Sequence, residues 1–590
     1  MSRLPVPRVM IVGVLAAALG MPPARAADPP REPVGARHAM VVTAQRLATE
    51  VGVDVLRRGG NAVDAAVAVG YMLAVVFPVA GNLGGGGFMT IRMADGRKTV
   101  VDFRETAPRA ASHDMYLDAA GRVVPGSSTH GVLAVGVPGT VAGLELARSR
   151  YGTMSRAALL APAIRAARDG FVLAPGDARF LQRSANGLRG DPAAAAIFVP
   201  HGRPLAAGER LVQRDLATTL ERIRDAGTAG FYRGPVAERI AAAMTAPDGR
   251  RRGLITQADL AAYRARERAP VECTYRGYRV LSAPPPSSGG VVLCEMLNIL
   301  QGVPLRSWGR GSVRATYVEI EAMRRAYRDR NRDLGDPDFV HNPVAHLLAP
   351  AYAARLRSGI VARMTAIPVH ARAGIPGDDA LGPTGREGAQ TTHYAIVDRA
   401  GNAVSVTVTL NGPFGAQVVA PGTGVLLNDE MDDFAVKPGT PNRYGLVQGE
   451  ANSIAPGKRP LSSMTPTILT KHGKPVLVVG TPGGSRIITG VLETILGVVD
   501  YGLDIQQAVD APRFHQQWRP RATMCEAGAL PAETRRTLES WGERFTIVAP
   551  YDHVDAILVG GPALGRAGKG GNRLFGADDA RGDTGLAAGY

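Results

Sequence analysis

The strongest structural constraint in this sequence is an abrupt change of pattern near residue 390. Residues 374–390 (GIPGDDALGPTGREGAQ) are polar, rich in glycine and proline and without apolar periodicity, which is typical of a surface loop or linker. Two β-type runs follow at once, THYAIVD (392–398) and AVSVTVTL (403–410), with the turn signal RAGN between them. The pattern predicts an antiparallel β-hairpin that begins directly after a loop.

Two threonines, Thr391 and Thr392, stand at the start of this hairpin. A threonine hydroxyl is a poor nucleophile at neutral pH and needs a base beside it. A threonine at the first position of a chain carries its own base, because a free α-amine titrates near pH 8 or lower. Cleavage between Gln390 and Thr391 would therefore create a nucleophile, and the same hydroxyl can make the cut by attacking the preceding carbonyl. The ordinary alternative is a threonine that simply suits a strand.

The N-terminal segment has the pattern of a secretory signal. Two arginines precede an apolar run at 9–19, and Ala24-Arg25-Ala26 ends the segment with a small-x-small motif. This pattern predicts a signal peptide over residues 1–26 that is cut after Ala26. The apolar run is too short for a stable membrane anchor, so we expect export to the periplasm or the medium.

Several further elements can be predicted from local signals. Residues 43–60 indicate a helix capped by Thr43, and Asn61 is expected to cap the next helix with Asp64 in its first turn. The uncharged stretch 65–91 is interrupted by proline and by GNLGGGGF, which favours a buried helix followed by a loop over a membrane span. Residues 91–103 predict two strands about a turn, and helical patterns dominate from 140 to 360, so the chain mixes α and β structure.

The net charge of +16 raises the question of nucleic-acid binding. Arginines do cluster, as in EAMRRAYRDRNRD (321–333), but acidic residues are interleaved and no nucleic-acid motif is present. We therefore expect a solvated, mildly basic surface and no nucleic-acid partner. Such a surface also favours the approach of small anions.

The cysteines and the remaining motifs exclude several kinds of site. Cys273, Cys294 and Cys525 allow at most one disulfide and form no CxxC pair; we expect buried free thiols and no metal site. The sequence has no GxSxG, HExxH or GxxxxGK[ST] motif. His393, near the predicted cut, is expected to pack or to form a hydrogen bond rather than to act as a catalytic base.

Many ordered motifs resemble one known family. On the C-terminal side these are TTHYAIVD, GNAVSVTVTLN, NDEMDDF, KRPLSSMTPT and GTPGGSRIITG. On the N-terminal side they are RRGGNAVDAAVAV, GNLGGGGF, DFRETAP, VPGTVAG and GDPDF. Together, from about His38 to the final GLAAGY, they resemble the γ-glutamyltransferases, which hydrolyse glutathione and belong to the N-terminal nucleophile (Ntn) enzymes.

The resemblance implies an α+β fold, the four-layer αββα sandwich of the Ntn hydrolases. It also implies a precursor that cleaves itself into two entwined subunits, here a large subunit of residues 27–390 and a small, catalytic subunit of residues 391–590. No metal or organic cofactor is implied.

Matched positions suggest a role for each site residue. Thr391 would be the nucleophile that forms a γ-glutamyl ester, and Thr409 would support its hydroxyl. Gly483 and Gly484 would let backbone N–H groups converge on an oxyanion, although a simple turn is the alternative. The remaining matched residues would hold the glutamyl α-carboxylate (Arg104, Ser462 and Ser463) and its α-ammonium group (Asn411, Glu430 and Asp433).

At some positions this sequence differs from other family members or carries a residue that only some members share. Asn411 is followed by Gly412-Pro413, where relatives often carry other small or hydroxylated residues. Position 430 is glutamate here, although glutamine occurs there in some bacterial members. Residues 438–450 resemble the lid loop of many bacterial members, with Tyr444 at the gating position. A lid that excludes water would favour transfer over hydrolysis.

The predicted activity is therefore transfer of the γ-glutamyl group of glutathione and other γ-glutamyl compounds to water, an amino acid or a dipeptide. One alternative is a glutaryl or cephalosporin-type acylase of the same fold, which would share Thr391 and the two glycines. A second alternative is an exported binding protein that is never processed.

Overall fold

The predicted hairpin lies at the centre of the fold. Strands β10 (Thr391–Val397) and β11 (Ala403–Thr409) pair antiparallel, with Thr391 opposite Thr409. The prediction is confirmed, except that β10 begins one residue earlier, at Thr391. Every residue of both strands is buried, and the threonine, serine and histidine side chains among them are buried together with the apolar ones.

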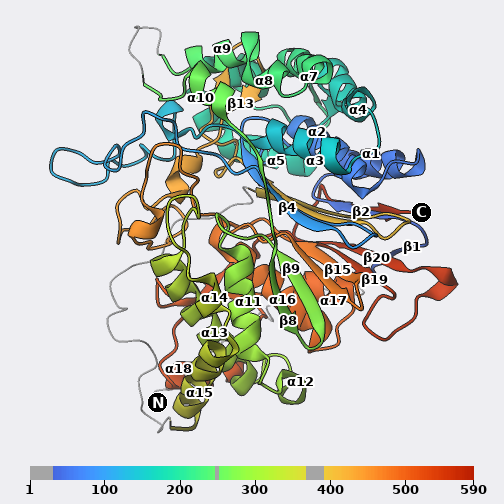
Figure 1. Ribbon diagram of the computed structural model, residues 1–590, viewed down its shortest axis with the longest axis vertical. Helices are drawn as coiled ribbons and strands as arrows, with labels where there is room; N and C mark the ends of the chain where they lie inside the picture. Colours follow the sequence, from blue (N-terminus) through green and yellow to red (C-terminus); the bar gives the residue numbers. More distant parts are fainter. Residues whose placement is uncertain (1–30, 246–251, 367–390) are drawn as a thin grey trace, which may run out of the picture. The chain divides into compact units, whose positions relative to one another are not determined.

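The computed structural model describes residues 31–245, 252–366 and 391–590 (Figure 1). The predicted signal peptide (1–26) and the whole predicted linker (374–390), with the cleavage residue Gln390, therefore lie outside the described residues. None of the helices in these three ranges combines the length and the apolar character that a membrane span requires.

Two seven-stranded sheets are stacked within residues 32–590. The first has the order β21 (Leu586–Gly589), β2 (Met40–Thr43), β10, β11, β3 (Gly86–Arg92), β4 (Lys98–Asp102), β7 (Arg266–Arg268). The second has the order β1 (Val34–Ala36), β20 (Leu574–Asp578), β19 (Asp555–Val559), β15 (Lys474–Gly480), β14 (Thr467–Lys471), β9 (Tyr278–Ser282), β8 (Val271–Tyr275). Both sheets mix strands from before and after Thr391.

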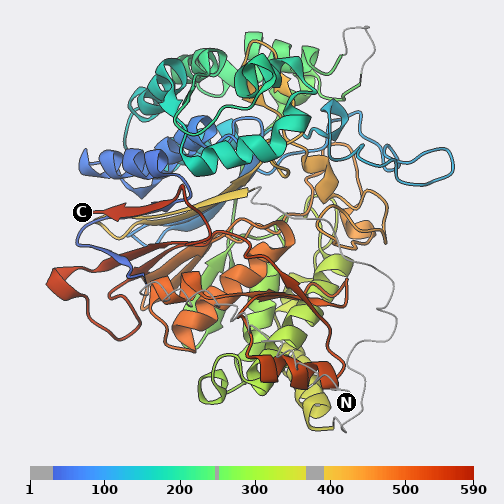
Figure 2. The ribbon, with the colours of Figure 1, turned by 180° about the vertical axis from the view of Figure 1, so that it is seen from behind.

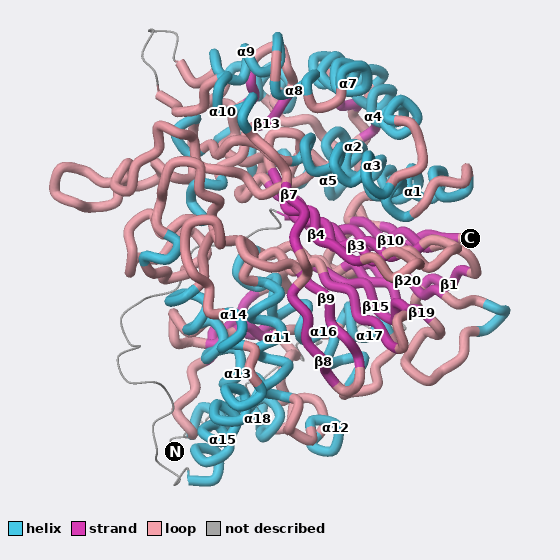
Figure 3. Tube along the Cα trace, viewed as in Figure 1, coloured by secondary structure: helices cyan, strands magenta, loops and turns pink. Residues whose placement is uncertain are grey.

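Helices cover the outer face of each sheet (Figures 1 and 3). On the first sheet these include α1 (Arg46–Arg57), α2 (Ala62–Val76), α3 (Thr140–Tyr151), α4 (Arg156–Asp169), α5 (Pro175–Leu188) and α7 (Arg214–Ala226). On the second they include α11 (Gly289–Leu300), α13 (Val313–Asp333), α15 (Pro350–Ala366), α16 (Ile487–Val499) and α17 (Ile505–Asp510). The view from behind shows the same four layers (Figure 2), so the chain has the predicted αββα sandwich.

Three apolar layers hold the sandwich together. Along β10, Tyr394 and Ile396 belong to the core beneath the first helical layer, while Ala395 and Val397 belong to the core between the two sheets. This alternation follows from the two-residue period of a strand. A third core joins the second sheet to its helices. The hairpin is thus fixed from both faces, and its first residue is fixed with it.

Helix α2 is buried along its whole length, so the uncharged stretch is an internal helix, as predicted. Asn61 caps it, as predicted, and Asp64 completes a reciprocal capping box, which was not predicted. The predicted cap of α1 is wrong: Thr43 ends strand β2, and the Gln45 side chain accepts the N–H of Leu47 instead. A strand that continues to residue 43 leaves no room for a cap there.

The prediction of free thiols is wrong for two of the three cysteines. Cys273 on β8 and Cys294 on α11 form a disulfide, with their Cα atoms 5.8 Å apart. The β8–β9 hairpin returns the chain so that α11 packs on β8, and sequence spacing alone did not reveal this proximity. Cys525 is free and buried, as expected, and burial raises the pKa of its thiol to about 11.

Candidate active site

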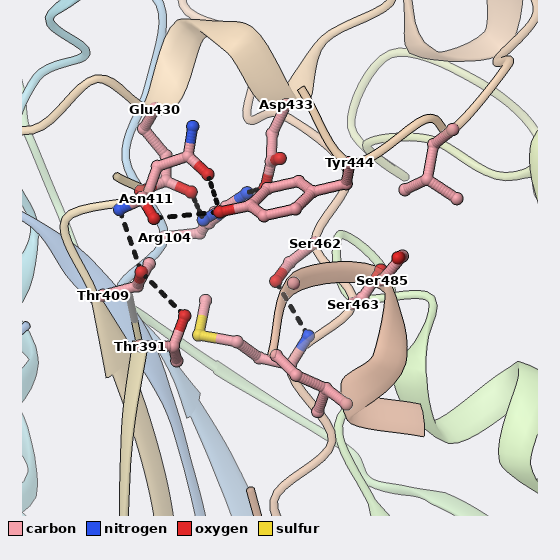
Figure 4. Close-up of a pocket in the computed structure, with 14 residues that line it drawn as sticks. Arg104, Thr391, Thr409, Asn411, Glu430, Asp433, Tyr444, Ser462, Ser463 and Ser485 are labelled. Atoms are coloured by element: carbon pink, nitrogen blue, oxygen red, sulfur yellow. Dashed lines mark hydrogen bonds and ion pairs between the residues drawn. The ribbon is translucent and has the colours of Figure 1, made fainter. Parts of the chain in front are cut away.

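Thr391 lines a small cavity at the end of the hairpin (Figure 4). The cavity volume is about 20 Å³, which is room for about one water molecule. Its lining brings together residues from both sides of the predicted cut. They are Arg104, Thr391, Thr409, Asn411, Glu430, Asp433, Tyr444, Leu446, Ser462, Ser463, Met464, Gly484, Ser485 and Ile487.

The two threonine hydroxyls are in direct contact. Thr391 Oγ1 lies 3.0 Å from Thr409 Oγ1, because the two residues are opposite each other in the β10–β11 register. The backbone N–H of Asn411 also donates to Thr409 Oγ1, at 2.9 Å. Thr409 therefore links the candidate nucleophile to Asn411, another residue that lines the cavity.

Asn82, which sequence reasoning missed, holds Thr409 from behind. Its Nδ2 donates to the Thr409 carbonyl oxygen at 2.9 Å, and its Oδ1 accepts from Thr140 Oγ1 at 2.7 Å and from the N–H of Gly85 at 2.9 Å. A Cβ at Gly85 would lie only 2.0 Å from the Thr409 carbonyl oxygen. The glycines of GNLGGGGF thus permit close backbone approach to the site, and their position in a matched motif was the available signal.

Acidic side chains surround Arg104. Its guanidinium forms ion pairs with Glu430 and Asp433 and lies 3.5 Å from Glu105, while its Nε donates to the Pro460 carbonyl oxygen at 3.1 Å. When all four charged groups are ionised, one positive charge faces three negative ones. The sequence prediction brought Arg104, Glu430 and Asp433 to one site but did not include their pairing with each other.

Burial and charge act in opposite directions on these groups. Burial raises the pKa of Glu430, and it raises the pKa of Glu105 to about 7, because neither carboxylate is well solvated. Burial alone would lower the pKa of Arg104, but the attraction of Glu430 and Asp433 outweighs it and raises the pKa. The acids of the cluster are therefore not readily all ionised beside a single guanidinium, and an incoming ammonium group would favour their ionised forms.

Two serines supply hydroxyl groups to the same cavity. Ser462 Oγ accepts the N–H of Met464 at 3.0 Å. Ser463 Oγ accepts from Nη2 of Arg330, a residue that sequence reasoning did not single out, at 3.0 Å. Both hydroxyls therefore already act as acceptors, which leaves their protons available for an anion in the cavity.

The paired glycines have the backbone that only glycine adopts easily. Gly483 has φ = 131° and Gly484 has φ = 56°, and a Cβ at Gly484 would lie 2.4 Å from the Tyr444 ring. Within the ranges that the structure describes, neither backbone N–H donates a hydrogen bond. Gly484 lines the cavity, whereas Gly483 is not among its lining residues.

Tyr444 closes the cavity. Its hydroxyl donates toward Asn411, with Oδ1 at 2.8 Å and the carbonyl oxygen at 2.9 Å, and its ring packs against Gly484. The Tyr444 carbonyl accepts from Gln517 Nε2 at 2.9 Å. The residue is 3% exposed, so its ring is buried against the cavity.

His393 takes no part in the cavity. Its Nδ1 lies 2.9 Å from Thr407 Oγ1, and burial lowers its pKa to about 3, so the ring is neutral at physiological pH. The expectation that it forms a hydrogen bond is confirmed. In the described parts of the chain, no group of three or more histidine, cysteine or acidic side chains is arranged to hold a metal ion.

The structure brings almost all predicted site residues to one place; Gly483 stands beside the cavity, and Gln390 is not described. Sequence reasoning missed four lining residues. Each lies within three residues of a predicted one, but its apolar or hydroxyl side chain carried no distinctive signal: Leu446, Met464, Ser485 and Ile487.

The profile of the family described as gamma-glutamyltranspeptidase matches residues 48–589. The chain is 59% identical over 559 residues to a "Glutathione hydrolase proenzyme" of Pseudomonas sp. (strain A14), with 95% of each chain covered. It is 47% identical to the protein of that name from Escherichia coli (strain K12), covering 95% of this chain and 93% of that one.

The fold is also similar to a solved structure with a different name. The cephalosporin acylase from Bacillus halodurans superimposes with a TM-score of 0.81 at 28% identity, over 97% of this chain and 99% of that chain. The relatives named glutathione hydrolase are more similar in sequence, and the family profile spans nearly the whole chain. From its sequence, its four-layer sandwich and the threonine-centred cavity, the chain belongs to the gamma-glutamyltranspeptidase family.

Proposed function

We propose that the chain is cut between Gln390 and Thr391 and that the mature enzyme transfers γ-glutamyl groups from glutathione and related compounds to water, an amino acid or a dipeptide. The observation that carries this proposal is the position of Thr391. It is the first residue of a buried strand, and its hydroxyl lies in a cavity whose polar groups suit the carboxylate and the ammonium of a glutamyl α-carbon.

The reaction follows from these groups. The free α-amine of Thr391 accepts the hydroxyl proton while Oγ1 attacks the γ-carbonyl. The N–H groups of Gly483 and Gly484 stabilise the negative charge that develops on the carbonyl oxygen. The leaving amine, cysteinylglycine in the case of glutathione, departs with a proton, and a γ-glutamyl ester remains. Water or an acceptor amine then attacks this ester and regenerates the hydroxyl.

Charge supports the assignment of the two ends of the substrate. Glu430 and Asp433, with the Asn411 side chain nearby, offer acceptors to an ammonium group. Ser462 and Ser463 offer protons to a carboxylate. In this proposal Arg104 stays between the two, and it exchanges part of its pairing with the acids for the substrate carboxylate.

The mixed sheets support a mature enzyme of two associated chains. A cut before Thr391 would leave β2, β3, β4 and β7 in a large subunit (27–390), hydrogen-bonded within one sheet to β10, β11 and β21 of a small subunit (391–590). The second sheet is divided in the same way. We also propose that residues 1–26 direct export, to the periplasm or the medium.

Denaturing electrophoresis with N-terminal sequencing tests the processing. We expect two bands that begin at Ala27 and Thr391, and Thr391→Ala should give one unprocessed band. A single full-length wild-type band would support the unprocessed binding protein instead.

The acylase alternative is tested by comparing γ-glutamyl and glutaryl anilides. The two substrates differ only in the α-ammonium group, and the acidic side chains around Arg104 favour the γ-glutamyl compound. Preferential turnover of the glutaryl anilide by mature enzyme would overturn the proposed specificity.

A further inference from the structure

Arg330 is a buried cation whose partners are all neutral. It lies near the end of α13, is 1% exposed and does not line the cavity. Its guanidinium donates to Ser288 Oγ at 2.9 Å, Asn331 Oδ1 at 2.8 Å, Gln448 Oε1 at 3.1 Å and Ser463 Oγ at 3.0 Å. Over the described ranges, no carboxylate lies within ion-pair distance of it.

This arrangement is unusual for a buried charge. A buried guanidinium normally pairs with an acid, because removing it from water without compensation is costly. On the same helix, Arg324 is paired with both Glu321 and Glu543. Burial lowers the pKa of Arg330 to about 10, so it is still protonated at neutral pH. Among the described residues, the positive charge next to the cavity therefore has no directly paired carboxylate.

The hydrogen bond to Ser463 determines what that hydroxyl can do. A serine hydroxyl has one proton to donate and lone pairs that accept. Ser463 Oγ accepts a hydrogen bond from Arg330 Nη2, so its own proton remains available for a group in the cavity. None of the described residues accepts that proton. A hydroxyl fixed as a donor binds an anion and disfavours a cation.

Through two intermediate side chains, the same guanidinium also contacts the backbone of Ser462 and of Asp433. Its Nε donates to Ser288 Oγ, which in turn donates to the Ser462 carbonyl oxygen at 2.7 Å. Its Nη1 donates to Gln448 Oε1, and Gln448 Nε2 donates to the Asp433 carbonyl oxygen at 3.0 Å. Arg330, which precedes the proposed cut, thus connects the segment of Ser462 and Ser463 to the segment of Asp433.

We propose that Arg330 is a positioning residue for the substrate α-carboxylate: it orients the Ser463 hydroxyl as a donor and supplies the uncompensated positive charge behind it. The inference rests on the proposed function, since it assumes that a γ-glutamyl carboxylate binds beside Ser463. Arg330 acts through Ser463 and touches no reacting atom.

A double-mutant cycle tests this role. Arg330→Met, Ser463→Ala and the double variant are compared with wild type as mature enzymes, with rates normalised to processed small subunit. We expect each single change to raise KM for a γ-glutamyl anilide roughly 10- to 100-fold with a smaller effect on kcat. The KM of the double variant should be no more than about threefold higher than that of the more impaired single variant. The reason is that both changes remove the same interaction, the hydrogen bond between Arg330 and Ser463.

The matched control is Arg332→Met. Arg332 lies two residues further along α13, is 60% exposed and pairs with Asp333, so its replacement should change KM less than about twofold. A KM for Arg330→Met within about twofold of wild type, or losses that multiply in the double variant, would overturn the inference. If Arg330→Met yields no mature enzyme, Arg330→Gln, which also removes the charge, takes its place in the cycle, with the same non-multiplicative result expected.

Failure of the inference and failure of the proposed function give different results. If mature wild-type enzyme and Arg332→Met do not turn over the γ-glutamyl anilide, the proposed function is wrong. If both are active and the losses multiply, only the role of Arg330 is wrong.

Discussion

Replacement of Asp433 by asparagine tests whether charge determines the substrate. Asp433 forms an ion pair with Arg104, lines the cavity, and has a side chain that is 14% exposed. Asparagine has nearly the same shape, so Asp433→Asn removes one negative charge with little change in packing. With every remaining group ionised, one positive charge would then face two negative ones instead of three.

The expected size of the effect follows from the position of the charge. Two unit charges 4 Å apart interact by about 4 kcal/mol at an effective dielectric constant near 20. Asp433 is partly exposed, and Glu430 stays to bind the ammonium group, so we expect about half of this value, ~2 kcal/mol. That energy corresponds to a loss of roughly 30-fold in kcat/KM for a γ-glutamyl anilide.

The assay compares this loss with that for the glutaryl anilide, which has no ammonium group. For the glutaryl compound we expect kcat/KM to change less than about threefold, because this substrate has no ammonium group for the Asp433 carboxylate to attract. Asp432→Asn is the matched control: Asp432 is buried in the same turn but accepts from Ser128 Oγ at 2.6 Å and does not line the cavity, so it should leave the substrate ratio unchanged. An equal loss for both substrates in Asp433→Asn would refute the reasoning.

Three further predictions concern other parts of the molecule. Thr409→Val removes the 3.0 Å contact with Thr391 and should lower kcat about 10- to 100-fold without lowering the melting temperature by more than a few degrees; unchanged kcat would contradict the role. Gly484→Ala places a Cβ 2.4 Å from the Tyr444 ring at positive φ and should destabilise the mature enzyme by about 2–4 kcal/mol, measured by urea unfolding. Burial raises the pKa of Glu319 to about 7, so the stability that it contributes is present below its ordinary pKa and is lost as the pH rises through 7. The free energy of unfolding of the wild type should therefore fall by up to about 3 kcal/mol more than that of Glu319→Gln between pH 5 and 8. Melting temperatures of wild type and variant that change in parallel with pH would exclude this.

Local rules were sufficient for much of the fold. The hairpin followed from two β-type runs about a turn, and the cap at Asn61 followed from its side chain and the acid three residues later. Both signals act within a few residues, so no knowledge of distant segments was needed. The same rules failed at Thr43, because a cap depends on where the preceding strand ends, and strand β2 is extended by pairing with β10 and β21.

The motifs also identified most residues of the site, but as separate segments. Sequence spacing did not show that Cys273 and Cys294 are bonded or that Arg330 donates to Ser463, 133 positions away. Nor did it show that Arg104 pairs with two acids more than 300 positions away.

By itself, the sequence determined the type of elements, the family and the identity of the candidate nucleophile, since these depend on residue type and local order. Only the tertiary structure decided which charges face each other, which hydroxyls are left to donate, and how tightly the cavity is closed. The physical reason is that the two stacked sheets interleave strands from both sides of Thr391, so contacts in the site are set by sheet order and register rather than by distance along the chain.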